Sequence, residues 1–159
     1  RIRMKITHLN KDGNANMVDV SDKIETTRIA TAQTTMVFNQ ETYQVLKNGY
    51  VKKGDILSVA QTAGIMGAKQ TSNLIPMCHP LNITSVNIEY LFMDESLELQ
   101  IQSTVKIAGK TGVEMEALMS VSITALTIYD MCKAIDKGIV IKETKLISKS
   151  GGKSGDFKR

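Results

Sequence analysis

The sequence is poor in aromatic residues and contains no tryptophan. Its 159 residues include three phenylalanines and four tyrosines, so a core must be built mainly from aliphatic side chains and nine methionines. Proteins that bind single-stranded nucleic acid stack the bases on aromatic rings. The shortage of rings therefore argues against that class of function, and we expect no nucleic-acid partner.

Cysteine, proline and long apolar runs are scarce as well. Cys78 and Cys132 show no framework of the secreted kind, which predicts free thiols and a cytoplasmic location. The two prolines and 11 glycines exclude a collagen-like or linker-dominated chain. The longest strongly apolar stretches, at 56–68 and 117–129, are interrupted by small polar residues and are shorter than a membrane span. We therefore expect no membrane partner and no signal peptide.

The remaining composition is ordinary for one soluble globular domain. A chain of 159 residues is long enough for one domain and short for two. A hydrophobic fraction of 42% and a charged fraction of 23% argue against wholesale disorder. The net charge of +4 suits an anionic ligand such as a nucleotide or phosphate, although many soluble proteins are as basic.

Hydrophobic periodicity predicts the order strand, helix pair, strand, strand, helix, strand. Asn39 and Asp55 are expected to cap the two helices of the pair, and small residues on the second of them predict close packing against a neighbour. The expected strands lie at 26–38, 86–90, 97–107 and 139–147, and the expected helices at 40–47, from 56, and at 116–137. The buried stripe of the long helix is expected to comprise Leu118, Val121, Ala125, Ile128, Cys132 and Ile135. This order predicts an α+β fold, the ferredoxin-like β-α-β-β-α-β arrangement, with an antiparallel sheet and its helices on one face.

Composition also divides the chain. Residues 1–25 are polar and form an expected N-terminal arm, of which residues 1–3 precede Met4, the expected natural start. Residues 26–148 form the single ferredoxin-like domain, and residues 149–159, rich in Gly, Lys and Ser, form an expected mobile tail.

Two short motifs invite functional interpretations that the spacing does not support. Gly152-Lys153-Ser154 resembles the end of a phosphate-binding loop, but Ile147 stands where that motif needs its first glycine. Cys78-His79 lies in a loop between Pro76 and Pro80, and no second ligand pair at zinc spacing accompanies it. We therefore expect no metal. A neutral histidine in this rigid loop can still donate to a phosphate or polarise a carbonyl.

Two groups of charged residues are compatible with acid–base chemistry. Glu114 and Glu116 lie at the entry to the long helix, where acids also stabilise the helix dipole. Asp130 and Lys133 share one side of that helix, where they form either an exposed ion pair or a base and acid that shift each other's pKa. The residues alone favour the structural interpretation in both places.

Five ordered strings carry a much more specific signal. Those at 53–55, 63–66, 74–81, 112–118 and 128–134 closely resemble the molybdenum cofactor biosynthesis protein C family, the cyclic pyranopterin monophosphate synthases. The strings at 17–21 and 149–155 extend the resemblance to nearly the whole chain. Departures are Met77 in place of Leu, Gly67 in place of Ala, and Asn16 where a basic residue is common. The last departure removes a positive charge that could contact a phosphate.

The resemblance implies a reaction and a set of site residues. The implied enzyme is a phosphorus–oxygen lyase without a cofactor, which converts 3′,8-cyclo-7,8-dihydroguanosine 5′-triphosphate into cyclic pyranopterin monophosphate and pyrophosphate. Asp130 and Lys133 would be the central acid–base pair, with Lys53 beside them. The implied substrate-binding residues are Met77, Cys78, His79, Met115 and Glu116 with Glu114 in support, and Arg28, Lys69 and Lys149 near the triphosphate.

The length of the expected helix makes the implied site impossible within one chain. Glu116 and Asp130 are 14 residues apart, which is roughly 21 Å along a helix. Two copies packed antiparallel would bring these residues together twice, in keeping with the homohexamer of three dimers that the resemblance implies. Two other functions remain open from the residues alone. One is a non-catalytic nucleotide- or RNA-binding module, although the strand at 97–105 has no stacking ring. The other is a regulatory sensor of a small ligand.

Overall fold

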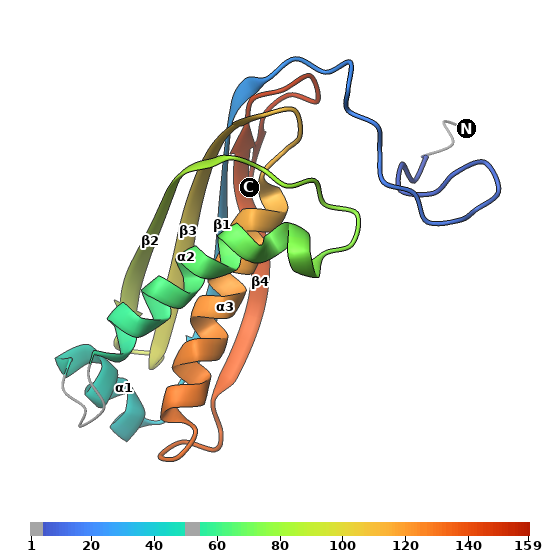
Figure 1. The fold of residues 1–159 in the computed structure, drawn as a ribbon. Coiled ribbons are helices and arrows are strands. Elements are labelled where there is room, and N and C mark those ends of the chain that lie inside the picture. Colours follow the sequence, from blue (N-terminus) through green and yellow to red (C-terminus); the bar gives the residue numbers. More distant parts are fainter. Residues whose placement is uncertain (1–4, 50–54) are drawn as a thin grey trace.

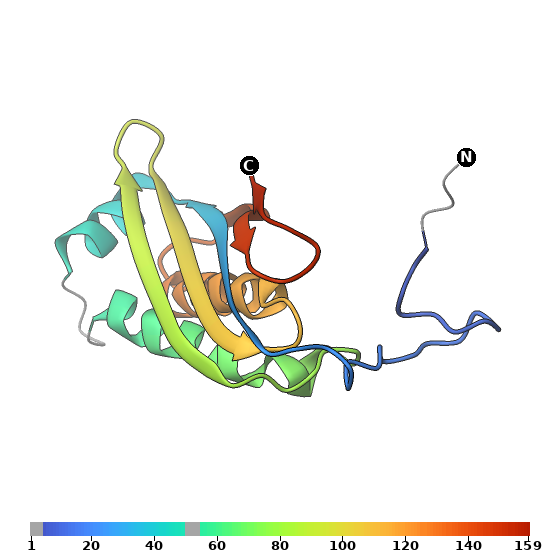
Figure 2. The same ribbon diagram turned by 90° about the horizontal axis from the view of Figure 1, so that it is seen from above.

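One antiparallel sheet with helices on a single face forms the body of the protein. The computed structural model describes residues 5–49 and 55–159. The elements follow in the order β1 (Thr26–Val37), α1 (Gln40–Asn48), α2 (Ile56–Leu74), β2 (Ile83–Met93), β3 (Glu98–Gly109), α3 (Glu114–Cys132), β4 (Val140–Ser150) and β5 (Phe157–Lys158). The strands are ordered β2-β3-β1-β4-β5. Helices α2 and α3 cover the same face (Figures 1 and 2). The predicted α+β, ferredoxin-like fold is therefore confirmed, with β5 as an additional strand.

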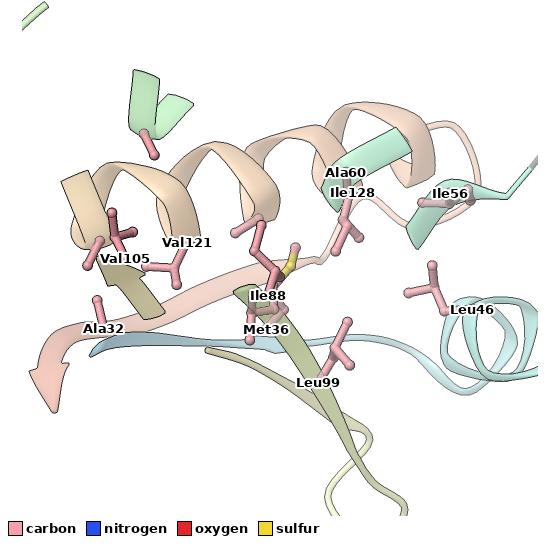
Figure 3. Close-up of a cluster of buried hydrophobic side chains, with 14 of the residues drawn as sticks. Ala32, Met36, Leu46, Ile56, Ala60, Ile88, Leu99, Val105, Val121 and Ile128 are labelled. Carbon is pink, nitrogen blue, oxygen red and sulfur yellow. The ribbon is translucent and has the colours of Figure 1, made fainter. Parts of the chain in front are cut away.

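The core lies between the sheet and α3. Alternate residues of β1 point toward the helices, so that Ala30, Ala32 and Met36 are completely buried. Their neighbours on β3 and the inner face of α3 complete the layer, and Figure 3 shows Leu99, Val121 and Ile128 within it. The same period-two pattern is what predicts the strands at 86–90 and 97–107 from the sequence.

The predicted starts of α1 and α2 are confirmed in detail, whereas α3 begins at Glu114, two residues before its predicted start. The Asn39 side chain accepts a hydrogen bond from the backbone N–H of Thr42 at 2.8 Å. The Asp55 carboxylate accepts from the N–H groups of Leu57 and Ser58. These bonds satisfy amide groups that have no partner inside the helix, and they mark where α1 and α2 begin.

Close packing of α2 is also confirmed, and its neighbour is α3. A Cβ atom on Gly64 would lie 2.1 Å from Oγ1 of Thr124, and one on Gly67 would lie 2.8 Å from the Ile123 side chain. A side chain at either position would require α3 or its side chains to shift. The small residues of α2 thus let the two helices approach closely.

The long helix ends earlier than predicted. It stops at Cys132 instead of Lys137, and Ile135, expected on the buried stripe, is 43% exposed. After Cys132 the chain turns, and the Asp136 carboxylate accepts hydrogen bonds from the N–H groups of Asn39 and Gly138. A short polar side chain that bonds backbone amides competes with helix continuation. The expected stripe is otherwise buried, with Leu118 partly so.

The boundary expected at residue 148 falls inside β4. That strand continues through Ser150, and β5 pairs with it at Ser148 and Lys149. The N–H of Arg159 also donates to the carbonyl of Ile147 at 2.8 Å. Pairing with a strand thus returns the tail to the domain, while the mobility of the residues between β4 and β5 stays a prediction.

The N-terminal segment extends from the domain as an arm (Figure 2). It is exposed over most of its length, yet it holds a local turn in which the Asn10 side chain accepts from the N–H groups of Asp12 and Asn14. None of the helices in the described ranges, 5–49 and 55–159, is long and apolar enough to cross a membrane.

Candidate active site

Three segments that are far apart in the sequence line one pocket at the N-terminal end of α3. The pocket has a volume of about 300 Å³. The loop after α2 contributes Met77, Cys78 and His79, and the start of α3 contributes Glu114, Met115 and Glu116. The third wall comes from the arm. The fold thus brings together six of the residues predicted to bind substrate, although only their order along the chain was visible in the sequence.

Glu116 is the most unusual group in this pocket. Only 4% of its surface is exposed. Burial raises its pKa from 4.5 to about 7, an effect that is opposed by a backbone hydrogen bond and increased by the nearby charge of Glu114. Burial, together with Glu116, raises the pKa of the Cys78 thiol as well. Near neutral pH the pocket therefore offers a carboxyl group poised to exchange a proton and a thiol that stays protonated.

The raised pKa of Glu116 predicts a pH-dependent stability change in the Glu116→Gln variant. In the folded protein Glu116 holds its proton up to about pH 7, whereas in the unfolded chain it loses the proton near its ordinary pKa of 4.5. The contribution of Glu116 to the free energy of unfolding is therefore fully present below pH 4.5 and is lost as pH rises through 7. Glutamine cannot ionise, so from acidic to alkaline pH the variant should gain about 1–3 kcal/mol in free energy of unfolding relative to the wild type.

Urea unfolding at both ends of this pH range measures the gain. Glu89→Gln, which replaces an exposed carboxylate on β2, is the matched control. A constant stability difference between Glu116→Gln and the wild type at all pH values would contradict the assignment.

Glu114 and Glu116 diverge because α3 begins at Glu114, and residues two apart on a helix point in different directions. Whereas Glu116 is buried beside the 77–79 loop, Glu114 is paired with Lys149 of β4, with Oε1 and Nζ 2.9 Å apart. This ion pair is half-buried. It joins the start of α3 to the end of β4 and connects the carboxylates of the pocket to a neighbouring group of cations.

Those cations surround a smaller cavity of about 110 Å³ lined by Lys23, Arg28, Glu114 and Lys149 among others. Arg28 is 9% exposed, and its guanidinium donates to the carbonyls of Gly109 at 3.1 Å and Lys110 at 3.2 Å. A Cβ on Gly152 would lie 2.0 Å from Nη1 of Arg28, so the glycine lets the tail pass over the guanidinium. The result is a positive cluster beside the carboxylates, suited to a polyanion, in which the backbone carbonyls hold Arg28 in place.

Sequence reasoning missed several residues that line these cavities. Lys23 borders both the larger pocket and the cationic cavity, and Thr7, His8 and Thr111 border the larger pocket. The available signal for Lys23 was its position two residues after the string at 17–21. The other three had no signal, because their approach to the pocket depends on how the arm and the β3–α3 loop fold.

Asp130 and Lys133 lie at the opposite end of α3. Lys133 donates to the Asp130 carboxylate at 2.8 Å, and this hydrogen bond and ion pair raise the pKa of the Lys133 ammonium. Both side chains are exposed. Because one helix separates Asp130 from Glu116 by roughly 21 Å, the predicted catalytic pair and the pocket do not meet within one chain.

Two further predicted residues are not placed in the pocket. Lys69 is exposed on α2 and is not among the residues that line the pocket or the cationic cavity. Lys53 lies outside the described residues. Within the described ranges, no group of three or more His, Cys, Asp or Glu side chains is arranged to hold a metal ion.

Comparison with known proteins identifies the family. A model of the MoaC family matches residues 17–152. The chain is 56% identical over 156 residues to a protein of Peptoclostridium acidaminophilum, covering 98% of both chains. It is 56% identical to one of Syntrophomonas wolfei (98% of this chain, 99% of that one) and 54% identical to one of Staphylococcus carnosus (98% and 97%). All three relatives are named cyclic pyranopterin monophosphate synthase. With this similarity spanning both the pocket and the Asp130–Lys133 pair, the chain belongs to the MoaC family.

Proposed function

We propose that this protein is a cyclic pyranopterin monophosphate synthase of molybdenum cofactor biosynthesis. It would convert 3′,8-cyclo-7,8-dihydroguanosine 5′-triphosphate into cyclic pyranopterin monophosphate with release of pyrophosphate. Family membership and the names of the relatives support this activity. The observation that carries the proposal is the single pocket formed by the 77–79 and 114–116 segments, which lies beside a cationic cavity.

The chemistry of the pocket suits the purine end of this substrate. Rebuilding a guanine ring into a pterin requires several proton transfers, which need titratable groups of both kinds at one site. A buried carboxyl group such as Glu116, with its pKa near 7, can hold or release a proton at neutral pH. We assign to Glu116 and His79 the contacts with the ring, with Met77, Cys78 and Met115 packing against it.

The cationic cavity suits the other end of the substrate. Closing a cyclic phosphate and expelling pyrophosphate increases the negative charge on the leaving group. We assign Arg28, Lys149 and Lys23 to the triphosphate, since all three line this cavity. Lys69 stays a candidate for the same role from a second copy. Asp130, Lys133 and Lys53 are proposed as the catalytic acid–base group.

We also propose that the active site lies at the interface of a dimer, three of which form the homohexamer. Helix α3 carries no charge between Ala117 and Tyr129, and Leu126 on its outer side is 54% exposed. On α2, Val59 and Met66 are 46% and 59% exposed. An uncharged helix with apolar side chains on its outer side is typical of one that is covered, so a second copy is the expected cover. The two free thiols support a cytoplasmic location.

Turnover of the cyclised nucleotide tests the proposal. We expect the protein, incubated with 3′,8-cyclo-7,8-dihydroguanosine 5′-triphosphate, to release pyrophosphate and form the cyclic pterin monophosphate, both detectable by chromatography. A ligand sensor would bind the nucleotide without consuming it, and an RNA-binding module would prefer RNA. Either of those results would overturn the proposed function.

A further inference from the structure

Asp136 is a buried acidic residue that ends α3 and lies outside both the pocket and the cationic cavity. Its residue surface is 4% exposed, although it lies in the turn after α3 between exposed neighbours. Its two oxygens accept different backbone N–H groups, Oδ1 that of Gly138 at 2.9 Å and Oδ2 that of Asn39 at 2.8 Å. Within the described ranges no lysine or arginine forms an ion pair with it. Backbone amides therefore satisfy both oxygens of this buried side chain.

The hydrogen bond from Asn39 to Asp136 is not needed to form the turn in which Asp136 lies. A tight turn at 136–138 needs only the bond from Oδ1 to Gly138, which is two residues away. Asn39 is 97 residues distant in the sequence and caps α1. The carboxylate thus ties the turn after α3 to the junction of β1 and α1, at the end of the sheet where α1 lies beside the end of α3 (Figure 1).

This tie lies directly beyond the Asp130–Lys133 pair. The N–H of Lys133 donates to the carbonyl of Tyr129, and that of Asp136 to the carbonyl of Cys132. Cys132 is completely buried, whereas the side chains of Asp130 and Lys133 are exposed. The Lys133 ammonium is placed by its ion pair with Asp130 and by the course of the backbone from which its flexible side chain extends. That backbone is held on one side by Cys132 and on the other by Asp136.

We propose that Asp136 is a positioning residue that holds Lys133 in place against Asp130 through its bond to the backbone of Asn39. The inference rests on the proposed function, in which the Asp130–Lys133 pair performs proton transfer. Small displacements of a catalytic group reduce turnover strongly. A change at Asp136 should therefore reduce the rate of the chemical step more than it reduces substrate binding.

Two variants and one matched control test the proposal. Asp136→Asn presents an amide N–H to one of the two donors. Asp136→Ser keeps a weaker local turn but has no second oxygen for residue 39, so it serves if the first variant folds poorly. The control is Asn39→Ala, which loses the cap of α1 but keeps the backbone N–H that Asp136 accepts.

We expect both Asp136 variants to lower kcat by about tenfold or more with KM changed less than about twofold. The control should keep a kcat near that of the wild type at a similar loss of melting temperature. Carbon-13 NMR at Cε of Lys133 gives an activity-independent measurement. The Asp130 contact raises the pKa of that ammonium, so the pKa should fall toward its ordinary value in both Asp136 variants only.

The possible results separate the two proposals. An unchanged kcat together with an unchanged Lys133 pKa in the Asp136 variants would overturn the positioning role. An equal loss of kcat in Asn39→Ala would overturn it as well. If the wild type itself releases no pyrophosphate, the proposed function fails, while the NMR titration still decides whether Asp136 positions Lys133.

Discussion

Replacing Asp130 by Asn, or Lys133 by Ala, is expected to lower turnover about 100- to 10,000-fold, as for other acid–base groups, and to leave the melting temperature nearly unchanged. Both side chains are exposed, and they lie outside the buried stripe of α3. Exposed ion pairs contribute little to folding stability. A large loss of activity without a loss of stability is therefore the signature of a catalytic pair.

Thermal unfolding and pyrophosphate release measure the two halves of this prediction. The matched control is Glu143→Gln, which breaks another exposed ion pair, between Glu143 and Lys145 on β4. That variant should keep normal turnover. Near-normal turnover in Asp130→Asn or Lys133→Ala, or a melting temperature several degrees lower, would remove the residue concerned from the catalytic group.

Mixing two inactive variants, Glu116→Ala and Asp130→Ala, is expected to restore activity if one site is built from two chains. In a mixed dimer one site combines both defects, and the other combines the intact Glu116 of one chain with the intact Asp130 of its partner. Random exchange makes half of the dimers mixed, with half of their sites intact. The expected recovery is about a quarter of wild-type activity.

The control for this experiment joins two defects at the same end of α3. Glu116 and His79 line one pocket of one chain, so mixing Glu116→Ala with His79→Ala should restore nothing. Subunit exchange is verified by mass spectrometry of differently labelled chains. A fully active monomer, or no recovery after verified exchange, would exclude the shared site.

The geometry of α3 is the reason to expect activity to recover in the mixture. Glu116 and Asp130 belong to one helix, Glu114–Cys132, and are separated by roughly 21 Å. Side chains of this size extend only a few ångströms, so they cannot contact one purine ring from the same chain. Two antiparallel copies of α3 would place the start of one beside the end of the other.

Features that depend on neighbouring residues were predictable from the sequence. The β-branched composition of β1, the alternation in β3, the caps at Asn39 and Asp55, and the small residues of α2 each specify structure within a few positions. These local signals are enough to determine the order of elements and hence the ferredoxin-like arrangement. The ordered motifs likewise identified the MoaC family, because matches of that length do not depend on the fold.

Features that depend on distant residues were decided by the tertiary structure. The end of α3 at Cys132 depends on Asp136, whose carboxylate meets the N–H of Asn39 only after folding. The raised pKa of Glu116 arises from burial, which no local pattern of charge reveals. Lys23 joins Arg28 and Lys149 because the arm, β1 and β4 converge at one end of the sheet. Burial and long-range hydrogen bonds are properties of the packed chain, so the sequence by itself determined which residues are present and the folded chain determined their pKa values and their partners.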